Sequence, residues 1–129
     1  MMILSIITLV LISLLMVMYR CFPIIQVVGN SMCPTYDDGE YLVGTRLYKK
    51  SDLKVGDVIV YRTPIENRVV IKRIDTIQVT RGKYYFYCLG DNSMFSHDSR
   101  NYGFVPQKNL ICKILNQRNK EEIGGNDCE

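Results

Sequence analysis

An uncharged, strongly apolar run near the N-terminus constrains this chain more than any other feature of its sequence. Residues 3–18 read ILSIITLVLISLLMVM, and only Ser5, Thr8 and Ser13 among them are polar. Extended by one tyrosine, the run reaches 17 residues, which is at the short end of the length that spans a bilayer as a helix. The run therefore predicts one N-terminal transmembrane helix, with an anchor over residues 1–20.

A secretory signal peptide is the alternative interpretation of this run. Such a peptide has a charged start, a shorter apolar core and a small-residue cleavage site. The chain starts with Met-Met-Ile, and the run ends in Met-Tyr-Arg-Cys-Phe without an A-x-A-like site. We therefore expect a retained anchor. Its orientation rests on Arg20 alone, which under the positive-inside rule weakly favours a cytoplasmic C-terminal part.

Composition narrows the classes of partner and site. The net charge is +3 with both signs interspersed, so there is no basic stripe to predict nucleic-acid binding. The five cysteines include no C-x-x-C pair and are odd in number, so neither a metal cluster nor a disulfide framework is expected. We expect mostly free or buried thiols, with one disulfide pair left open, and a monomer that needs no metal and no cofactor.

After the anchor the chain is patterned as short strands rather than helices. Apolar and β-branched runs bounded by turn residues occupy residues 40–45, 58–61, 68–74, 77–79, 84–89, 103–106 and 110–115. No helical apolar stripe of useful length appears after residue 25. The fold class predicted is mainly β: a compact antiparallel β-sheet domain over residues 21–116. Residues 117–129 are polar and are expected to fray as a tail.

Ser31 is a candidate nucleophile in the segment VVGNSMCPTYDDGE, residues 27–40. A serine hydroxyl needs a base within hydrogen-bond reach to act in this way. The single histidine, His97, lies in a polar loop, which is more typical of a solvated surface group. A lysine can serve instead when burial lowers its pKa and keeps the amine neutral. Cys33 has no obvious activating base and is expected to pack or to line a groove.

Lys72 is the lysine whose neighbours best suit a neutral base. In VVIKRI, residues 69–74, alternate side chains share a face of the strand, so Lys72 is expected between Val70 and Ile74. Apolar neighbours on the same face favour the free amine. A lysine on an edge strand would instead reach water with its amine, and the pattern alone leaves both alternatives open.

A third informative segment, GDNSMFSHDSRNYGFVP, covers residues 90–106. Its structural interpretation is an Asx- and serine-rich loop stabilised by an Asp–Arg pair. Its functional interpretation is a supporting shell, in which a hydroxyl holds the lysine amine and the charges fix the loop.

In this order, the three segments resemble the type I signal peptidases, a family of membrane-anchored serine–lysine peptidases. The family pattern S-M-x-P-T matches residues 31–35, and its K-R pair in an apolar strand matches residues 72–73. The pattern G-D-N-x-x-x-S-x-D-S-R-x-x-G-x-V matches residues 90–105, and L-x-x-G-D-V-I-V matches residues 53–60. The resemblance extends from the anchor to about residue 115.

The resemblance implies a role for each matching residue. Ser31 would attack the scissile carbonyl, and neutral Lys72 would take its proton and later activate water. Ser96 would orient the lysine amine, and the Ser31 backbone N–H would serve the oxyanion hole. The supporting residues are Gly29, Asn30, Asp91 with Arg73, and Asp98 with Arg100. The substrate-binding candidates are Val28, Met32, Val69, Val70 and Ile71.

The function implied is that of a membrane-bound signal peptidase I, which cleaves secretory preproteins after small, alanine-like residues. Its catalytic domain would lie on the extracytoplasmic side of the cell membrane, and this outweighs the single Arg20. Gly29 stands where some members have a serine donor, so the oxyanion hole would rely on backbone. Residues 72–90 are also shorter than in most bacterial members. The alternatives are a peptidase dedicated to one partner, such as a pilin-like or conjugation protein, and a non-catalytic tethered module that binds extended peptides.

Overall fold

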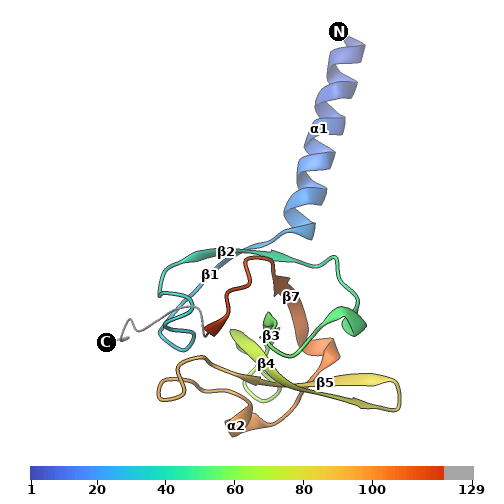
Figure 1. Ribbon diagram of the computed structural model, residues 1–129. Helices are drawn as coiled ribbons and strands as arrows, with labels where there is room; N and C mark the ends of the chain where they lie inside the picture. The colour runs from blue at the N-terminus through green and yellow to red at the C-terminus, as the bar shows by residue number, and fades with distance from the viewer. Residues whose placement is uncertain (121–129) are drawn as a thin grey trace.

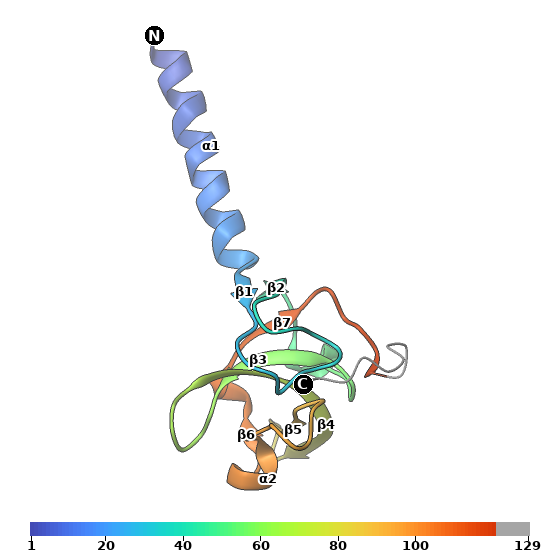
Figure 2. The same ribbon diagram turned by 90° about the vertical axis from the view of Figure 1, so that its left-hand side faces the viewer.

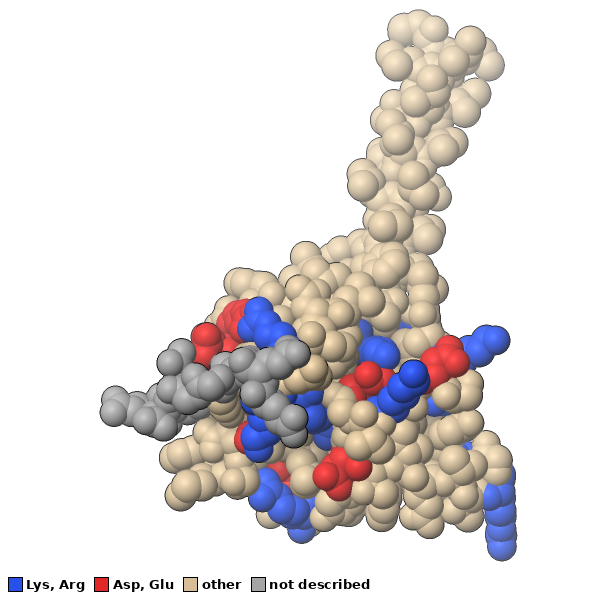
Figure 3. All heavy atoms as spheres, viewed as in Figure 1, with Lys and Arg blue, Asp and Glu red and all other residues tan. Residues whose placement is uncertain are grey.

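The N-terminal helix stands clear of the rest of the molecule. In this computed structural model, which describes residues 1–120, α1 spans Met2–Cys21 and buries none of its residues. With 20 residues and Arg20 as its one charged side chain, it is long and apolar enough to cross a membrane. Figures 1 and 2 show it extending away from a small body. On the face in Figure 3, the charged side chains that can be seen lie on that body and not on the helix. The predicted single apolar helix is confirmed.

The body is one antiparallel sheet of seven strands, as the fold class predicts. The strands are β1 (Ile24–Gln26), β2 (Tyr41–Thr45), β3 (Val58–Arg62), β4 (Val69–Thr80), β5 (Lys83–Leu89), β6 (Val105–Pro106) and β7 (Leu110–Ile114). Their order across the sheet is β1-β2-β7-β3-β4-β5-β6. The short helical elements are α2 (Ser99–Tyr102) and two 3-10 turns, η1 (Lys50–Asp52) and η2 (Gln107–Asn109).

The β4–β5 hairpin follows from its turn residues. Arg81 and Gly82 both have positive φ, 51° and 73°, as a two-residue turn matched to the strand twist requires. The turn sets Thr80 opposite Lys83. The run expected at residues 68–74 continues through residues 77–79 as one strand, β4, with a register shift between Ile74 and Thr76.

The core has two layers, one on each face of the sheet. The central strand β3 is buried on both faces, with Val58 and Val60 in one layer and Ile59 and Tyr61 in the other. The first layer also contains Val27, Met32, Tyr36, Leu42, Ile71, Cys112 and Ile114. The second contains Leu53, Ile74, Phe86, Cys88 and Val105. The segment that carries Ser31 therefore folds over the first layer and is held there by apolar packing.

The anchor is joined to the sheet through a very short connection. Only Phe22 and Pro23 separate α1 from β1. The Arg46 N–H donates to the carbonyl of Cys21 at 2.9 Å, and the Gly44 N–H donates to that of Pro23 at 2.8 Å. The end of the helix is thus hydrogen-bonded to β2 and its following residue.

Two expectations about individual segments need correction. Cys21, Cys88 and Cys112 are free thiols as predicted, but Cys33 is disulfide-bonded rather than simply packed against a groove. Residues 117–129 were expected to fray as a tail, but Gln117 and Arg118 make defined hydrogen bonds. The partners of these bonds lie far away in sequence. Residues 121–129 lie outside the described part of the chain.

Candidate active site

Ser31 and Lys72 are hydrogen-bonded to each other, although they come from a turn and from a strand of the sheet. Ser31 lies in a series of turns between β1 and β2, where the Cys33 N–H donates to the carbonyl of Asn30 and the Tyr36 N–H to that of Met32. Lys72 lies on β4, opposite Ile59 of β3. Its Nζ donates a hydrogen bond to Ser31 Oγ at 2.6 Å. A hydroxyl and an amine at this distance can exchange a proton directly.

The surroundings of Lys72 favour its neutral form. The residue is only 4% exposed, so the alternative in which the amine reaches water is wrong for this fold. Burial lowers the pKa of Lys72 to about 8, although the negative charges of Asp98 and Asp91 oppose the shift. A substantial fraction of the amine is therefore neutral near pH 8, and an amine must be neutral to accept a proton.

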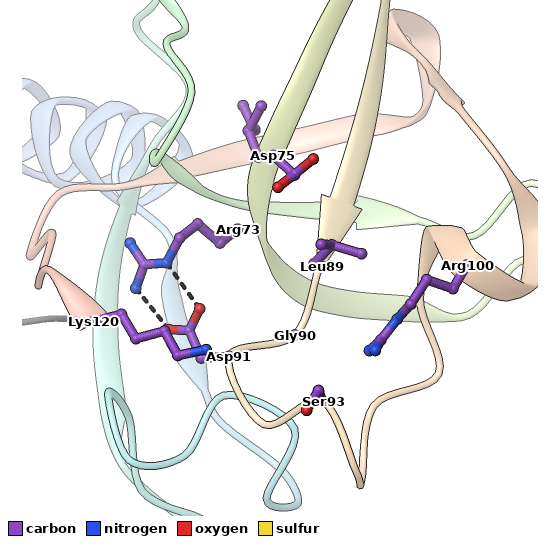
Figure 4. Close-up of a pocket in the computed structure, with 9 residues that line it drawn as sticks. Arg73, Asp75, Leu89, Gly90, Asp91, Ser93, Arg100 and Lys120 are labelled. Carbon is purple, nitrogen blue, oxygen red and sulfur yellow. Dashed lines mark hydrogen bonds and ion pairs between the residues drawn. The ribbon is translucent and has the colours of Figure 1, made fainter. Parts of the chain in front are cut away.

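A second loop holds the opposite side of Ser31. The Asn92 N–H donates to the Ser31 carbonyl at 3.0 Å. The neighbouring Asp91 accepts two hydrogen bonds from Arg73, at 2.9 and 2.7 Å, as Figure 4 shows. The two side chains are largely buried, and a bidentate pair of this kind fixes direction as well as distance. The expected Arg73–Asp91 pair therefore ties the loop that touches Ser31 to the strand that carries Lys72.

Gly90 allows this loop to approach at backbone distance. A Cβ at this position would lie 2.6 Å from the Ser31 carbonyl oxygen and 2.1 Å from Ser96 Oγ. Both contacts are far inside van der Waals separation, and the first is to backbone, which cannot turn aside. A side chain at residue 90 would push the loop away from Ser31.

Asp98 accepts hydrogen bonds from several polar groups of the same loop. It is fully buried and accepts hydrogen bonds from the Gly90 N–H at 2.9 Å, Ser96 Oγ at 2.6 Å and the Arg100 guanidinium at 2.9 and 2.7 Å. Burial alone would raise the pKa of Asp98, but the bonds from Arg100, Gly90 and Ser96 hold it well below its usual range. The expected Asp98–Arg100 pair is present. Ser96, expected on the lysine amine, donates to Asp98 instead.

The backbone before Ser31 presents free donors. Gly29 has φ +83°, and a Cβ added there would meet nothing within 4 Å, so its left-handed conformation, rather than lack of space, calls for glycine. Its N–H donates to Asp38 Oδ1 at 2.7 Å. Within residues 1–120, the N–H groups of Asn30 and Ser31 make no hydrogen bond. Two adjacent donors are therefore available beside the serine hydroxyl.

A cavity of about 150 Å³ adjoins the pair. Its lining includes Ser31 and Lys72, four of the predicted substrate-binding residues and three that sequence reasoning missed. The four are Val28, Val69, Val70 and Ile71; the three are Ile25, Gln26 and Val60. The volume is below the roughly 300–1,000 Å³ of sites for drug-sized ligands, so the cavity suits small apolar groups.

Met32 is the predicted groove residue that the structure places elsewhere. Its side chain is 0% exposed and packs in the first core layer, because the turn after Ser31 points it toward the sheet. The three missed residues lie on β1 and β3, and only strand pairing brings them to the cavity. The apolar, β-branched run Ile24–Val28, interrupted only by Gln26, was the sequence signal that could have indicated the β1 contribution.

Other candidate chemistry is not assembled in the described chain. His97 lies 3.9 Å from Glu66 and packs beside Tyr102 of α2. Among residues 1–120, no group of three or more His, Cys, Asp or Glu side chains is placed to hold a metal ion.

Comparison with known proteins finds matches to a peptidase family and to two of its members. The model of the family described as signal peptidase, peptidase S26, matches residues 1–78 and 75–116. The mitochondrial inner membrane protease subunit 1 of Schizosaccharomyces pombe is 33% identical over 105 residues, which cover 67% of this chain and 67% of that protein. Signal peptidase I of Buchnera aphidicola subsp. Baizongia pistaciae is 54% identical over 33 residues, which cover 26% of this chain and 11% of that protein.

Proposed function

This chain belongs to the signal peptidase family, peptidase S26, and we propose that it is a membrane-bound signal peptidase I with Ser31 as nucleophile and Lys72 as general base. The observation that carries the proposal is the 2.6 Å hydrogen bond between the two side chains. The amine is buried, so its pKa is suited to proton transfer near neutral pH.

The proposed reaction has two halves that use the same lysine. Ser31 Oγ attacks the scissile carbonyl carbon while its proton passes to the neutral Lys72 Nζ. The tetrahedral intermediate then breaks its C–N bond, and the lysine ammonium gives the proton to the departing amine. In the second half, Lys72 takes a proton from water, whose oxygen attacks the acyl-enzyme ester. The ester bond breaks, and the proton returns to Ser31 Oγ.

The developing oxyanion would be bound by backbone. The free N–H groups of Ser31 and Asn30 are fixed donors of the type that stabilises such a charge. Gly29 contributes the turn and no side-chain donor. The Ser96 hydroxyl donates to Asp98, so its proposed role is to support the loop beside the Lys72 amine. Asp98, Arg100, Arg73 and Asp91 would then act as supports that hold this arrangement.

The proposed substrates are secretory preproteins cleaved after small residues. The cavity beside the pair is small and has apolar side chains in its lining, which fits an alanine-like side chain better than a large one. The apolar α1 would keep the enzyme in the membrane that holds the substrate's own apolar segment, with the sheet on the extracytoplasmic side.

Cleavage of a preprotein by the detergent-solubilised full chain tests the proposal. We expect Ser31→Ala and Lys72→Ala each to lower the rate at least about 100-fold while the domain stays folded. Lys108→Ala removes an exposed lysine and is expected to leave the rate unchanged. Full cleavage by either site variant would refute the serine–lysine pair.

Two further measurements separate the alternatives. A penem-type acylating agent is expected to add covalently to Ser31, and mass spectrometry would find the adduct missing in Ser31→Ala. The absence of an adduct in the wild type would favour the non-catalytic module. A panel of unrelated preproteins addresses the dedicated peptidase, because such an enzyme would ignore most of the panel.

A further inference from the structure

Residues 116–118, which follow β7 and which we call the strap, cross from the sheet to the segment that carries Ser31. In Figures 1 and 2 the red end of the described chain lies beside the blue-to-teal segment between β1 and β2. Gln117 fastens the strap to the sheet. Its Oε1 accepts from the Val58 N–H at 2.9 Å, and its Nε2 donates to the Val58 carbonyl at 3.3 Å and to that of Ile114.

The sheet end of the strap is hydrogen-bonded to Val58, one position along β3 from the residue opposite Lys72. Val58 is paired with Arg73 on β4, and the next pair along the two strands is Ile59 with Lys72. The Gln117 amide therefore continues the hydrogen bonding of β3 at the point where that strand begins. Anything held by the strap is held relative to the strand pair that positions Lys72.

Arg118 fastens the other end to the segment after Ser31. Its Nη1 donates to the Thr35 carbonyl at 3.1 Å, and its guanidinium holds Glu40 with a shortest distance of 2.6 Å. The guanidinium also lies over the Tyr36 ring, 5.2 Å from its centroid. The Arg118 N–H donates to the Tyr36 hydroxyl at 3.1 Å, and that hydroxyl donates to the Asn116 carbonyl at 2.7 Å.

The contacts of Arg118 are with the same turn that contains the nucleophile. The Tyr36 N–H donates to the Met32 carbonyl at 3.0 Å, so Tyr36 and the residue after Ser31 belong to one hydrogen-bonded unit. Thr35 and Tyr36 are fully buried. A displacement of this unit would pass directly to Ser31 and lengthen its contact with Lys72.

We infer that the strap sets the distance between Ser31 and Lys72, and that Arg118 is a positioning residue for the reaction. The inference rests on the proposed function of the two side chains. Arg118 touches neither of them. Its side chain is 44% exposed, so its removal opens no cavity in the core, and its effect is expected on geometry more than on global stability. Reaction rates fall steeply when reacting groups are misplaced by as little as about 1 Å.

Arg118→Ala in the detergent-solubilised full chain tests the inference. We expect kcat to fall about 10–100-fold, while KM and the midpoint of the pH profile stay near their wild-type values. Millimolar methylguanidinium is expected to restore part of the lost kcat by occupying the vacated position. Lys108→Ala removes one positive charge from an exposed site and is the matched control, with unchanged kcat.

Amide hydrogen exchange supplies a measurement that does not depend on activity. Faster exchange over residues 31–40 in Arg118→Ala, with β3 and β4 unchanged, is the expected result. An unchanged kcat, an equal loss in Lys108→Ala, or faster exchange throughout the sheet would each overturn the positioning role. If the wild type cleaves no preprotein, the proposed function fails. In that case, unchanged exchange over residues 31–40 in Arg118→Ala would also overturn the strap as a positioning element.

Discussion

Lys72 Nζ donates a 2.6 Å hydrogen bond to Ser31 Oγ across 41 positions of sequence. The two residues come from a turn and from a strand, and within residues 1–120 two hydrogen-bonded links connect those elements. One runs through Arg73, Asp91 and the Asn92 N–H, and the other through Gln117 and Arg118. The contact is therefore preorganised by the fold, and each of its supports can be tested separately.

The pH dependence of wild-type activity should follow the ionisation of Lys72. Because burial lowers the pKa of Lys72 to about 8, and only the neutral amine accepts a proton, kcat/KM is expected to rise about tenfold per pH unit below pH 8. It should level off above that value. Initial rates of peptide cleavage between pH 6 and 10 would show this, and a profile that falls toward alkaline pH would contradict a lysine base.

Lys72→Met should make the domain more stable at neutral pH while abolishing activity. The unfolded lysine has a pKa of 10.5 and the folded one about 8, so unfolding takes up a proton and the buried amine costs stability below pH 8. This cost is about 3 kcal/mol at pH 7, shrinks as pH rises and vanishes above about 10.5. We expect a higher melting temperature for the variant at pH 7 and none of that gain at pH 11.

The matched control for that comparison is Lys108→Met on the exposed 3-10 turn η2. It should change the melting temperature little at either pH. A variant at Lys72 that melts below the wild type at pH 7 would show that the hydrogen bond to Ser31 outweighs the cost of burying the amine.

Gly90→Ala should lower activity through a local clash. The new Cβ would lie 2.6 Å from the Ser31 carbonyl oxygen, so the loop has to move and the Asn92 hydrogen bond to that oxygen is lost. We expect kcat to fall at least about 10-fold. Gly44→Ala places a Cβ 2.8 Å from Cys112 Sγ, away from the site, and should lower the melting temperature without lowering kcat per folded molecule.

Asp98→Asn should lower stability at every pH above about 4. The carboxylate accepts hydrogen bonds from Arg100, Ser96 and Gly90, and bonds to a charged group contribute about 1.5–3 kcal/mol each. Because these bonds hold the pKa of Asp98 well below 3.8, its contribution is present above that value and is lost only as pH falls through the lower, folded value.

Thermal melts of wild type and Asp98→Asn from pH 7 to pH 2 would measure this. The gap in melting temperature should stay constant down to about pH 4 and narrow only in stronger acid. Asp75→Asn, which removes an exposed carboxylate from the same sheet, should show almost no gap. A gap that closes already between pH 7 and pH 5 would mean that a different group dominates.

Much of the fold could be predicted from short-range patterns in the sequence. The apolar run of α1 needs no partner within the chain, and the alternation in Val69–Ile74 follows from the pleat of a strand. Both could therefore be predicted from neighbours alone. The same alternation left a buried Lys72 open as one of two alternatives. Lys72 is buried because β4 pairs with β3, where Ile59 lies opposite it.

Features that depend on distant partners could not be predicted in this way. The direction of the Met32 side chain is set by the turn after Ser31 and by the sheet beneath it, so a residue expected in the groove lies in the core. Gln117 and Arg118 look like any polar tail, because their partners lie 59 and 83 positions away. The strand edges that bring Ile25 and Val60 to the cavity likewise exist only once the sheet has formed.

The short connection between α1 and β1 limits how far Ser31 can lie from the end of the helix. Ser31 follows the end of α1 by ten positions, so it can lie no farther from that end than about 35 Å, even with the chain fully extended. The hydrogen bonds from Gly44 and Arg46 to the same connection also make the sheet tilt when the helix tilts. In a protein anchored by α1, Ser31 would reach only those peptide bonds that lie within this distance of the bilayer. The thickness of the membrane would therefore influence which bond is cleaved.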